Sequence, residues 1–254
     1  MDTGKKSVLS FFLLVFVLSL PFWLIGAVTG LQLLPGLPVS ALMSLCPATA
    51  ALILVYRKEN TDGTVQLLKR SLDYSRIKAK AWYIPIIFLM PCASLLTYAL
   101  MHFMGSPLRA PSFHVVVALA MVAVFFLAAV CEELGWMGYA IDPLQERFNA
   151  LEASLILGML WAAWHWVPLT QTDRSMSWIA WWTLYTVALR VVIVWLYNNT
   201  DKSVFAAAFF HAMSNVSGIM FSGYYDPRIT GLIMSFAAAA VTVVWGWRML
   251  ARPI

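Results

Sequence analysis

Residues 115–139 read VVVALAMVAVFFLAAVCEELGWMGY, and this stretch decides the fold. From Pro111 to Cys131 the chain carries no Lys, Arg, Asp or Glu, and a helix needs about 20 predominantly apolar residues to span a bilayer. Glu132 and Glu133 follow this run without a break. The stretch therefore predicts a transmembrane helix that carries two adjacent carboxylates.

The rest of the 254-residue chain has the same character. It is 61% hydrophobic and 11% charged, with a mean hydropathy of +0.78, whereas soluble domains carry about 25% charged residues. We expect an all-α polytopic membrane protein, with about eight transmembrane helices around an intramembrane polar cavity. Hydropathy places the spans near 8–29, 37–56, 82–104, 113–140, 150–169, 176–197, 203–221 and 229–249.

The chain has no internal repeat and no linker that would separate two folding units. We therefore interpret residues 1–254 as a single integral membrane domain. Its chemically distinctive residues fall within a core at about 113–221.

Basic residues predict the orientation. With the N-terminus inside, thirteen Lys and Arg residues fall on the inner side and three, Arg109, Arg174 and Arg228, on the outer side. The positive-inside rule then places both termini in the cytoplasm of a cell membrane. A compact chain without an organelle signal is typical of a prokaryotic protein.

The net charge of +5 does not require a nucleic-acid partner. The basic residues concentrate in the 57–80 loop, where anionic lipid attracts each of them by about 1 kcal/mol. Apolar residues interleave with them at Val65, Leu67, Leu68 and Leu72, a pattern that predicts a short helix on the inner membrane face. Membrane lipid is the partner that this segment indicates.

Glu132 and Glu133 are the candidate chemical groups. An ionised carboxylate near the bilayer centre costs about 2.5–3.5 kcal/mol on insertion scales, so such residues are usually functional. Two adjacent carboxylates also repel, and we expect the pair to share a proton. A shielded carboxylate suits a general base. The alternative is a polar pair that only packs one helix against another.

His165 and His211 lie inside the fifth and the seventh predicted spans. His211 and Asn215 are four residues apart, so both face the same side of a helix and could bind an oxyanion or an ion. Trp161 and His165 have the same spacing, and we interpret Trp161 as a supporting wall of the imidazole. The remaining histidines, His102 and His114, are expected at the interface.

These elements resemble one family. Glu132-Glu133-Leu-Gly-Trp-Met-Gly-Tyr139 is similar to the EExxxR motif, commonly seen as EE-x-G-W-R-G-Y, of the CPBP intramembrane proteases. These are the CAAX-processing and bacteriocin-processing enzymes, also called the Abi family. Trp161-Ala-Ala-Trp-His165 resembles their aromatic-xxx-His motif, and His211-Ala-Met-Ser-Asn215 resembles their Hxxx[ND] motif. All three occur in the family's order.

The resemblance implies hydrolysis of a peptide bond in a membrane-associated peptide or protein substrate. Carried over, Glu132 activates water, His165 holds that water, and His211 with Asn215 stabilises the oxyanion. Glu133 then serves as a supporting or ligand carboxylate. Members are usually described as metalloproteases, so Zn²⁺ or another divalent ion held by Glu132, His165 and His211 is one expectation. A metal-free glutamate mechanism is the other, because no HExxH motif is present.

One position departs from the family pattern. The motif arginine is replaced by Met137, which cannot neutralise Glu133. Arg190 is the one cation expected well inside a span, at a depth that matches the glutamates, and we predict that it pairs with them. The alternative is that Arg190 reaches toward the inner interface.

Two other functions stay open at this point. A catalytically silent scaffold or immunity-type relative would explain Met137. A proton-coupled transporter would use the glutamates as a relay, although the chain lacks the inverted repeat common in such proteins.

Overall fold

A computed structural model describes residues 8–34, 37–108, 115–221 and 225–251. The expected all-α polytopic fold is confirmed. The helices are α1 (Val8–Thr29), α2 (Cys46–Lys69), α3 (Tyr83–Phe103), α4 (Val115–Gly135), α5 (Ile141–Gln145), α6 (Ala150–Thr170), α7 (Met176–Asn199), α8 (Val204–Met220) and α9 (Pro227–Trp245).

Short elements connect these helices. Strands β1 (Gln32–Leu34) and β2 (Leu37–Pro38) form an antiparallel pair that the hydropathy pattern does not predict. The 3₁₀-helices are η1 (Val39–Leu45), η2 (Arg70–Leu72), η3 (Tyr74–Arg76) and η4 (Lys80–Trp82). The π-helical segment η5 (Trp136–Ala140) joins α4 to α5.

In the described part of the chain, seven helical stretches are long and apolar enough to cross a membrane. The eighth predicted span corresponds to α8, which has 17 residues. At 1.5 Å per residue it extends about 25 Å, less than the roughly 30 Å of hydrocarbon. The prediction of about eight spans thus yields seven long helices and one shorter apolar helix.

Two of the predicted spans, 37–56 and 113–140, have the wrong boundaries. Residues 37–45 form a strand and η1, and the helix predicted to end at residue 56 continues to Lys69, with a break at Asn60 (φ 55°, ψ −154°). The charged side chains of this extension are largely exposed, so they do not oppose helix formation. The fourth helical stretch likewise runs past residue 140 to Gln145, and the predicted start at 113–114 lies outside the described residues.

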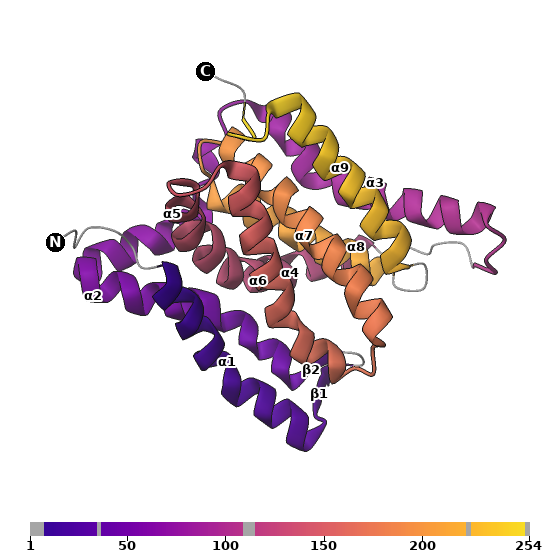
Figure 1. The fold of residues 1–254 in the computed structure, drawn as a ribbon, viewed down its shortest axis with the longest axis horizontal. Coiled ribbons are helices and arrows are strands. Elements are labelled where there is room, and N and C mark those ends of the chain that lie inside the picture. Colours follow the sequence, from indigo (N-terminus) through magenta and orange to yellow (C-terminus); the bar gives the residue numbers. More distant parts are fainter. Residues whose placement is uncertain (1–7, 35–36, 109–114, 222–224, 252–254) are drawn as a thin grey trace.

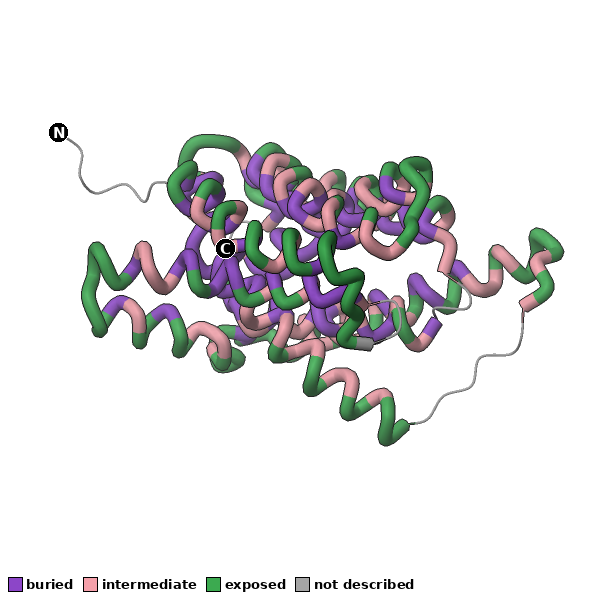
Figure 2. The backbone as a smooth tube through the Cα atoms, turned by 90° about the horizontal axis from the view of Figure 1, so that it is seen from below, coloured by how far each residue is buried: buried purple, intermediate pink, exposed green. Residues whose placement is uncertain are grey.

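The helix α7 lies at the centre of the bundle, packed against α6, α8 and α9. Every residue of α7 from Ala188 to Tyr197 is buried. Figure 1 shows α1 and α2 along one side of this central group and α3 and α9 along the opposite side. Buried residues concentrate in the middle of the bundle, while the first half of α4 and the end of α3 project from it (Figure 2).

The four consecutive helices α6 to α9 begin with a polar cap. The side chains of Asn149, Ser175, Ser203 and Asp226 each accept a hydrogen bond from a backbone N–H of the following turn. Such caps satisfy donors that a helix start leaves free. The sequence thereby fixes where each of these helices begins.

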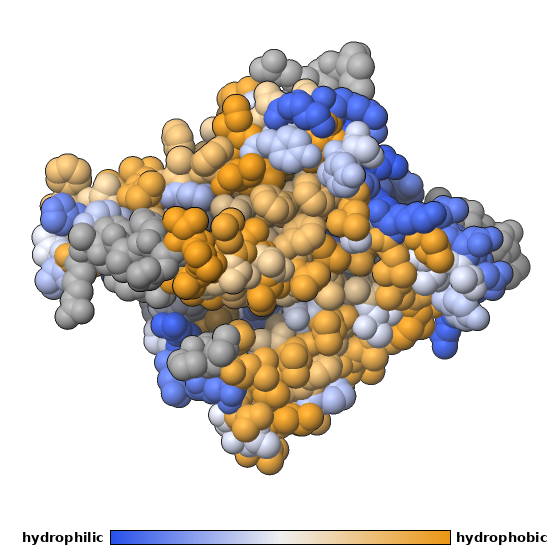
Figure 3. Space-filling model, turned by 180° about the vertical axis from the view of Figure 1, so that it is seen from behind, coloured by the Kyte–Doolittle hydropathy of each residue, from blue (hydrophilic) through white to orange (hydrophobic). Residues whose placement is uncertain are grey.

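The surface agrees with a membrane position. On the face shown in Figure 3 apolar residues cover most of the area, and hydrophilic residues gather mainly toward the upper right and at the lower left. Large exposed apolar side chains are frequent on α1 and α4, such as Leu9, Val28 and Val116. An apolar belt between two polar ends is what a bilayer requires.

Gly135 sets how closely α4 approaches α2. A Cβ at Gly135 would lie 2.6 Å from the backbone carbonyl carbon and oxygen of Pro47. Glycine alone permits this approach, because the obstructing atoms are backbone and cannot rotate away. The two glutamates, two and three residues before Gly135, depend on this helix position.

Gly135→Ala is therefore expected to destabilise the protein. Overpacking in a core costs roughly 1–3 kcal/mol, and a backbone clash belongs at the upper end of that range. Thermal unfolding in detergent measures the loss. Gly218→Ala is the control, because nothing lies within 4 Å of a Cβ there; a melting temperature for Gly135→Ala equal to that of the control would contradict the prediction.

Candidate active site

Glu133 forms the most deeply buried charged contact of the described structure. Its carboxylate accepts hydrogen bonds from Arg190 Nη1 at 2.6 Å and Nη2 at 3.1 Å. Both side chains have no exposed surface. The predicted pairing of Arg190 with the glutamates is confirmed, and it is specifically with Glu133.

His211 completes this contact. Its Nδ1 lies 2.9 Å from Glu133 Oε1. A carboxylate only accepts, so Nδ1 carries the hydrogen and Nε2 is left for other partners. Glu133 on α4, Arg190 on α7 and His211 on α8 thus form one buried network of three helices.

Glu132 has different partners. Its Oε2 accepts a hydrogen bond from Trp161 Nε1 at 2.7 Å and a longer one from Trp136 Nε1 at 3.4 Å. Its Oε1 has no hydrogen-bond partner among the described residues, and the residue keeps 7% of its surface exposed. The indoles orient one carboxylate oxygen and leave the other available.

The two carboxylates therefore occupy separate environments. Adjacent helical residues point about 100° apart, and here one carboxylate contacts a guanidinium and an imidazole while the other contacts two indoles. The expected sharing of a proton between them is not supported by this geometry. Glu133 is neutralised by Arg190 instead.

His165 lies in an aromatic enclosure. Ring centroids of Trp164, Trp182 and Trp161 lie 4.8, 5.4 and 5.6 Å from that of the imidazole. Its Nδ1 lies 2.9 Å from the Trp161 carbonyl oxygen. A carbonyl only accepts, so this contact puts the hydrogen on Nδ1 and leaves Nε2 as the acceptor of a neutral ring.

Trp161 connects these groups. Its indole N–H binds Glu132, its carbonyl binds His165, and its ring lies 5.0 Å from the His211 ring and 4.0 Å from the Arg190 guanidinium carbon. The sequence pattern predicts only a supporting role for Trp161. Its spacing to His165 was the available signal, but the hydrogen bond to Glu132 depends on how α6 packs.

The structure brings together Glu132, Glu133, His165 and His211 around Trp161. Asn215 is half-buried one turn beyond His211 on α8, and it makes no hydrogen bond to the other described residues. Its side chain is therefore available to a ligand. His102, at the end of α3, is exposed and lies outside this network.

Local backbone features hold the site in place. The π-helical residues 136–140 begin three residues after Glu133, and π-helical turns within α-helices are frequent at functional sites. At Gly158, a Cβ would lie 3.1 Å from Arg190 Cβ and from Val187 Cα. The missing side chain lets α6 approach α7, which places Trp161 against Arg190.

Glu132, His165 and His211 are not grouped as a metal site in this structure. Across the described residues, no group of three or more His, Cys, Asp or Glu side chains is placed to hold one ion. Glu132 Oε2 is occupied by two indole N–H donors, and His211 Nδ1 by Glu133. The atoms of the predicted set that lack a partner among the described residues are Glu132 Oε1 and the Nε2 atoms of the two histidines.

Comparison with known proteins points to one family. The family model for Type II CAAX prenyl endopeptidase Rce1-like proteins matches residues 114–217. A CAAX prenyl protease 2 of the archaeon Methanococcus maripaludis is 29% identical over 258 aligned positions, covering 91% of this chain and 92% of that protein. These matches support a CPBP-family protease. Together with the apolar helices, they support a multi-pass membrane endopeptidase.

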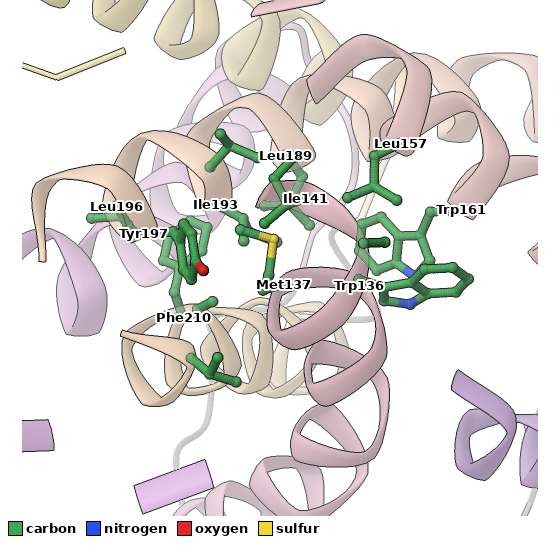
Figure 4. Packing of buried hydrophobic residues seen from close by; sticks show 14 of the residues in the cluster. Trp136, Met137, Ile141, Leu157, Trp161, Leu189, Ile193, Leu196, Tyr197 and Phe210 are labelled. Atoms are coloured by element: carbon green, nitrogen blue, oxygen red, sulfur yellow. The ribbon is translucent and has the colours of Figure 1, made fainter. Parts of the chain in front are cut away.

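The similarity to this family raises the question of which cation replaces the motif arginine, whose place Met137 takes. Met137 is fully buried, and Figure 4 shows it among apolar side chains that include Ile141 and Ile193, while Trp136 and Trp161 lie on the other side of the motif helix. Arg190, from a different helix, neutralises the protease's Glu133. The cation of the motif is thus present in space although absent from its usual place in the sequence.

Arg190→Met is expected to destabilise the protease strongly and to abolish its activity. Removing one partner of a buried ion pair costs about 3–5 kcal/mol, because the other charge is left unpaired. The double variant Met137→Arg, Arg190→Met should recover part of the stability, because the new guanidinium starts four residues from Glu133. Thermal unfolding in detergent and activity are the measurements.

Arg174→Met serves as the control, since Arg174 is exposed and its contact is the ring of Trp178. A double variant no more stable than Arg190→Met alone would show that position 137 cannot supply the charge. An Arg190→Met protein that melts like the parent would show that the ion pair does not stabilise the fold.

Proposed function

We propose that the chain hydrolyses a peptide bond near the C-terminus of a prenylated, membrane-anchored protein, with Glu132 as the general base. The observation that carries the proposal is the asymmetry of the Glu132 carboxylate. Oε2 is fixed by two indole donors, and Oε1 has no described partner. A buried, oriented carboxylate with one available oxygen is suited to take a proton from water.

In the proposed mechanism, water lies between Glu132 Oε1 and His165. His165 Nε2 is an acceptor because Nδ1 binds the Trp161 carbonyl, so it can hold one hydrogen of the water while Glu132 accepts the other. The oxygen then attacks the carbonyl carbon of the scissile bond. The surrounding tryptophans exclude bulk water, which strengthens these polar contacts.

The developing oxyanion is assigned to His211 and Asn215. The Asn215 amide is a donor without a described partner, one turn from His211. For Nε2 of His211 to donate as well, the ring must carry both hydrogens, and the adjacent Glu133 carboxylate stabilises that cation. Glu132 finally returns its proton to the leaving amine.

The substrate class is proposed from the relatives. The similar archaeal protein is named a CAAX prenyl protease, and the matching family is described as a prenyl endopeptidase. Proteins ending in Cys-aliphatic-aliphatic-X are prenylated on that cysteine, which brings their C-terminus to the membrane. We also propose that both termini of the chain lie in the cytoplasm, as its basic residues indicate.

Glu132→Gln is expected to abolish cleavage while leaving the fold intact, because an amide cannot accept the proton of water. Asn215→Ala, which removes one oxyanion donor, should lower kcat by roughly 10²–10³-fold. The assay uses protein reconstituted in liposomes and a farnesylated peptide ending in Cys-aliphatic-aliphatic-X, with a fluorophore and quencher on either side of the scissile bond.

Glu152→Gln is the matched control, because Glu152 is an exposed carboxylate at the start of α6. The same peptide without the farnesyl group tests the substrate class. Unchanged cleavage by Glu132→Gln would assign the base elsewhere. Equal cleavage of the two peptides would remove the prenyl group from the proposed specificity.

Activity is expected to survive prolonged chelation, because the site offers no three-ligand set for a divalent ion. The test combines chelator treatment with elemental analysis of the same active preparation. Loss of activity on chelation, restored by Zn²⁺ and accompanied by stoichiometric metal, would establish a metal mechanism and would require the side chains to rearrange.

A further inference from the structure

Arg70 forms hydrogen bonds to three chain segments at or near helix ends, and the proposed mechanism gives it no role. Its Nη1 donates to the Gly138 carbonyl at 2.9 Å, and its Nη2 donates to the Tyr197 hydroxyl at 2.8 Å and to the Lys202 carbonyl at 2.9 Å. These acceptors belong to the π-helical segment after the glutamates, the end of α7 and the turn before α8. One guanidinium thus links the chain segments that carry Glu133, Arg190 and His211.

The Gly138 carbonyl has a particular need for this donor. In a π-helical register a carbonyl pairs with the N–H five residues later, and the residue five positions after Gly138 is Pro143, which has no N–H. Arg70 supplies this carbonyl with a hydrogen bond that position 143 cannot give. Its rigid fork can serve several acceptors at once, which the point charge of a lysine cannot do in the same geometry.

Asp73, three residues later, holds the beginning of α8. Its carboxylate accepts hydrogen bonds from Ser203 Oγ at 2.8 Å, Phe205 N at 3.0 Å and Val204 N at 3.3 Å. Free N–H groups and the positive end of the helix dipole favour a carboxylate at this point. Asp73 therefore fixes the end of the helix that presents His211 and Asn215.

The two residues act as one unit, which we call the Arg70–Asp73 clamp. Arg70 Nε lies 3.9 Å from Asp73 Oδ2, and Arg76 Nε lies 3.5 Å from the same oxygen. His211 is six residues after Phe205, about 9 Å along α8 at 1.5 Å per residue. The clamp thus lies near the catalytic groups without touching them.

The charges of the clamp alone contribute little stability. Partly exposed ion pairs are worth about 0–1 kcal/mol, and the Arg70 and Arg76 side chains keep 22% and 45% of their surface. The structural effect of the clamp comes from the groups that its hydrogen bonds connect. They reach the π-helical segment after α4, Tyr197 near the end of α7, the turn before α8, and the N-cap and first residues of α8.

We propose that Arg70 and Asp73 are positioning residues for the peptidase reaction. They fix the axial positions of α4, α7 and α8 relative to one another, and so keep His211 and Asn215 in register with Glu132. This rests on the proposed function for its kinetic readout. Small displacements of catalytic groups can lower rates by about 10²-fold, so positioning has a kinetic effect larger than its effect on stability.

The experiment compares Arg70→Gln and Arg70→Lys with Lys78→Gln, a change at an exposed basic residue of the same loop. Arg70→Gln should lower kcat by about 10–100-fold with KM little changed, and should shift the pH dependence of kcat/KM. Arg70→Lys should recover only part of kcat, and Lys78→Gln should behave as the parent. Cleavage of the farnesylated peptide in liposomes is measured at matched amounts of folded protein.

A second measurement does not depend on activity. Spin labels at the exposed positions Val124 on α4 and Ile219 on α8, in a background without Cys46, Cys92 and Cys131, report the distance between the two helices. Arg70→Gln and Asp73→Asn should shift or broaden that distance distribution, whereas Lys78→Gln should not. If Arg70→Gln does not fold, Tyr197→Phe removes one acceptor of Arg70, together with the hydrogen bond that the hydroxyl donates to Asp142, and should give a smaller change of the same kind.

The two measurements separate the possible failures. An inactive parent protein whose helix distance still responds to Arg70→Gln would contradict the proposed function and leave the clamp standing. An active parent whose kcat, pH profile and helix distance are all unaffected by Arg70→Gln would overturn the clamp. A lowered melting temperature with unchanged kcat and pH profile per folded molecule would also overturn it, because that is a purely structural role.

Discussion

The buried contact between Glu133 and Arg190 is the constraint on which the rest of the site depends. Both groups are charged and fully removed from solvent, and removing either one would leave the other unpaired at a cost of about 3–5 kcal/mol. With His211 on the same carboxylate, the contact is satisfied only when α4, α7 and α8 hold one relative position. Glycine at 135 and 158 lets neighbouring helices approach closely enough for this.

The division of roles between the two glutamates follows from that constraint. Because Glu133 is committed to Arg190 and His211, it is a structural and electrostatic residue in the proposed mechanism. Glu132 lies one residue earlier and faces the indoles of Trp136 and Trp161, which donate hydrogen bonds without neutralising its charge. Two identical side chains thus acquire different chemistry from their surroundings, a pattern common among paired catalytic carboxylates.

The position of Arg190 helps to distinguish a protease from the two alternatives, a catalytically silent relative and a proton-coupled transporter. A catalytically silent relative was suggested by Met137, since the missing motif arginine would leave Glu133 without a partner. Arg190 fills that role from another helix, so Met137 no longer argues against catalysis. A proton relay would need both glutamates to exchange protons readily, whereas a carboxylate held by a buried guanidinium in two hydrogen bonds is a poor carrier.

The sequence alone determined the membrane class and the number of apolar helices to within one, because hydropathy is a local property. From four-residue spacing it also predicted the residues of the candidate site. It also placed Arg190 at the depth of the glutamates. The structure decided which glutamate Arg190 binds, the role of Trp161 and the continuation of α2 to Lys69. These depend on how side chains from distant helices meet, and no local pattern encodes such a meeting. The Arg70–Gly138 contact spans 68 residues, and tertiary packing alone brings its two atoms together.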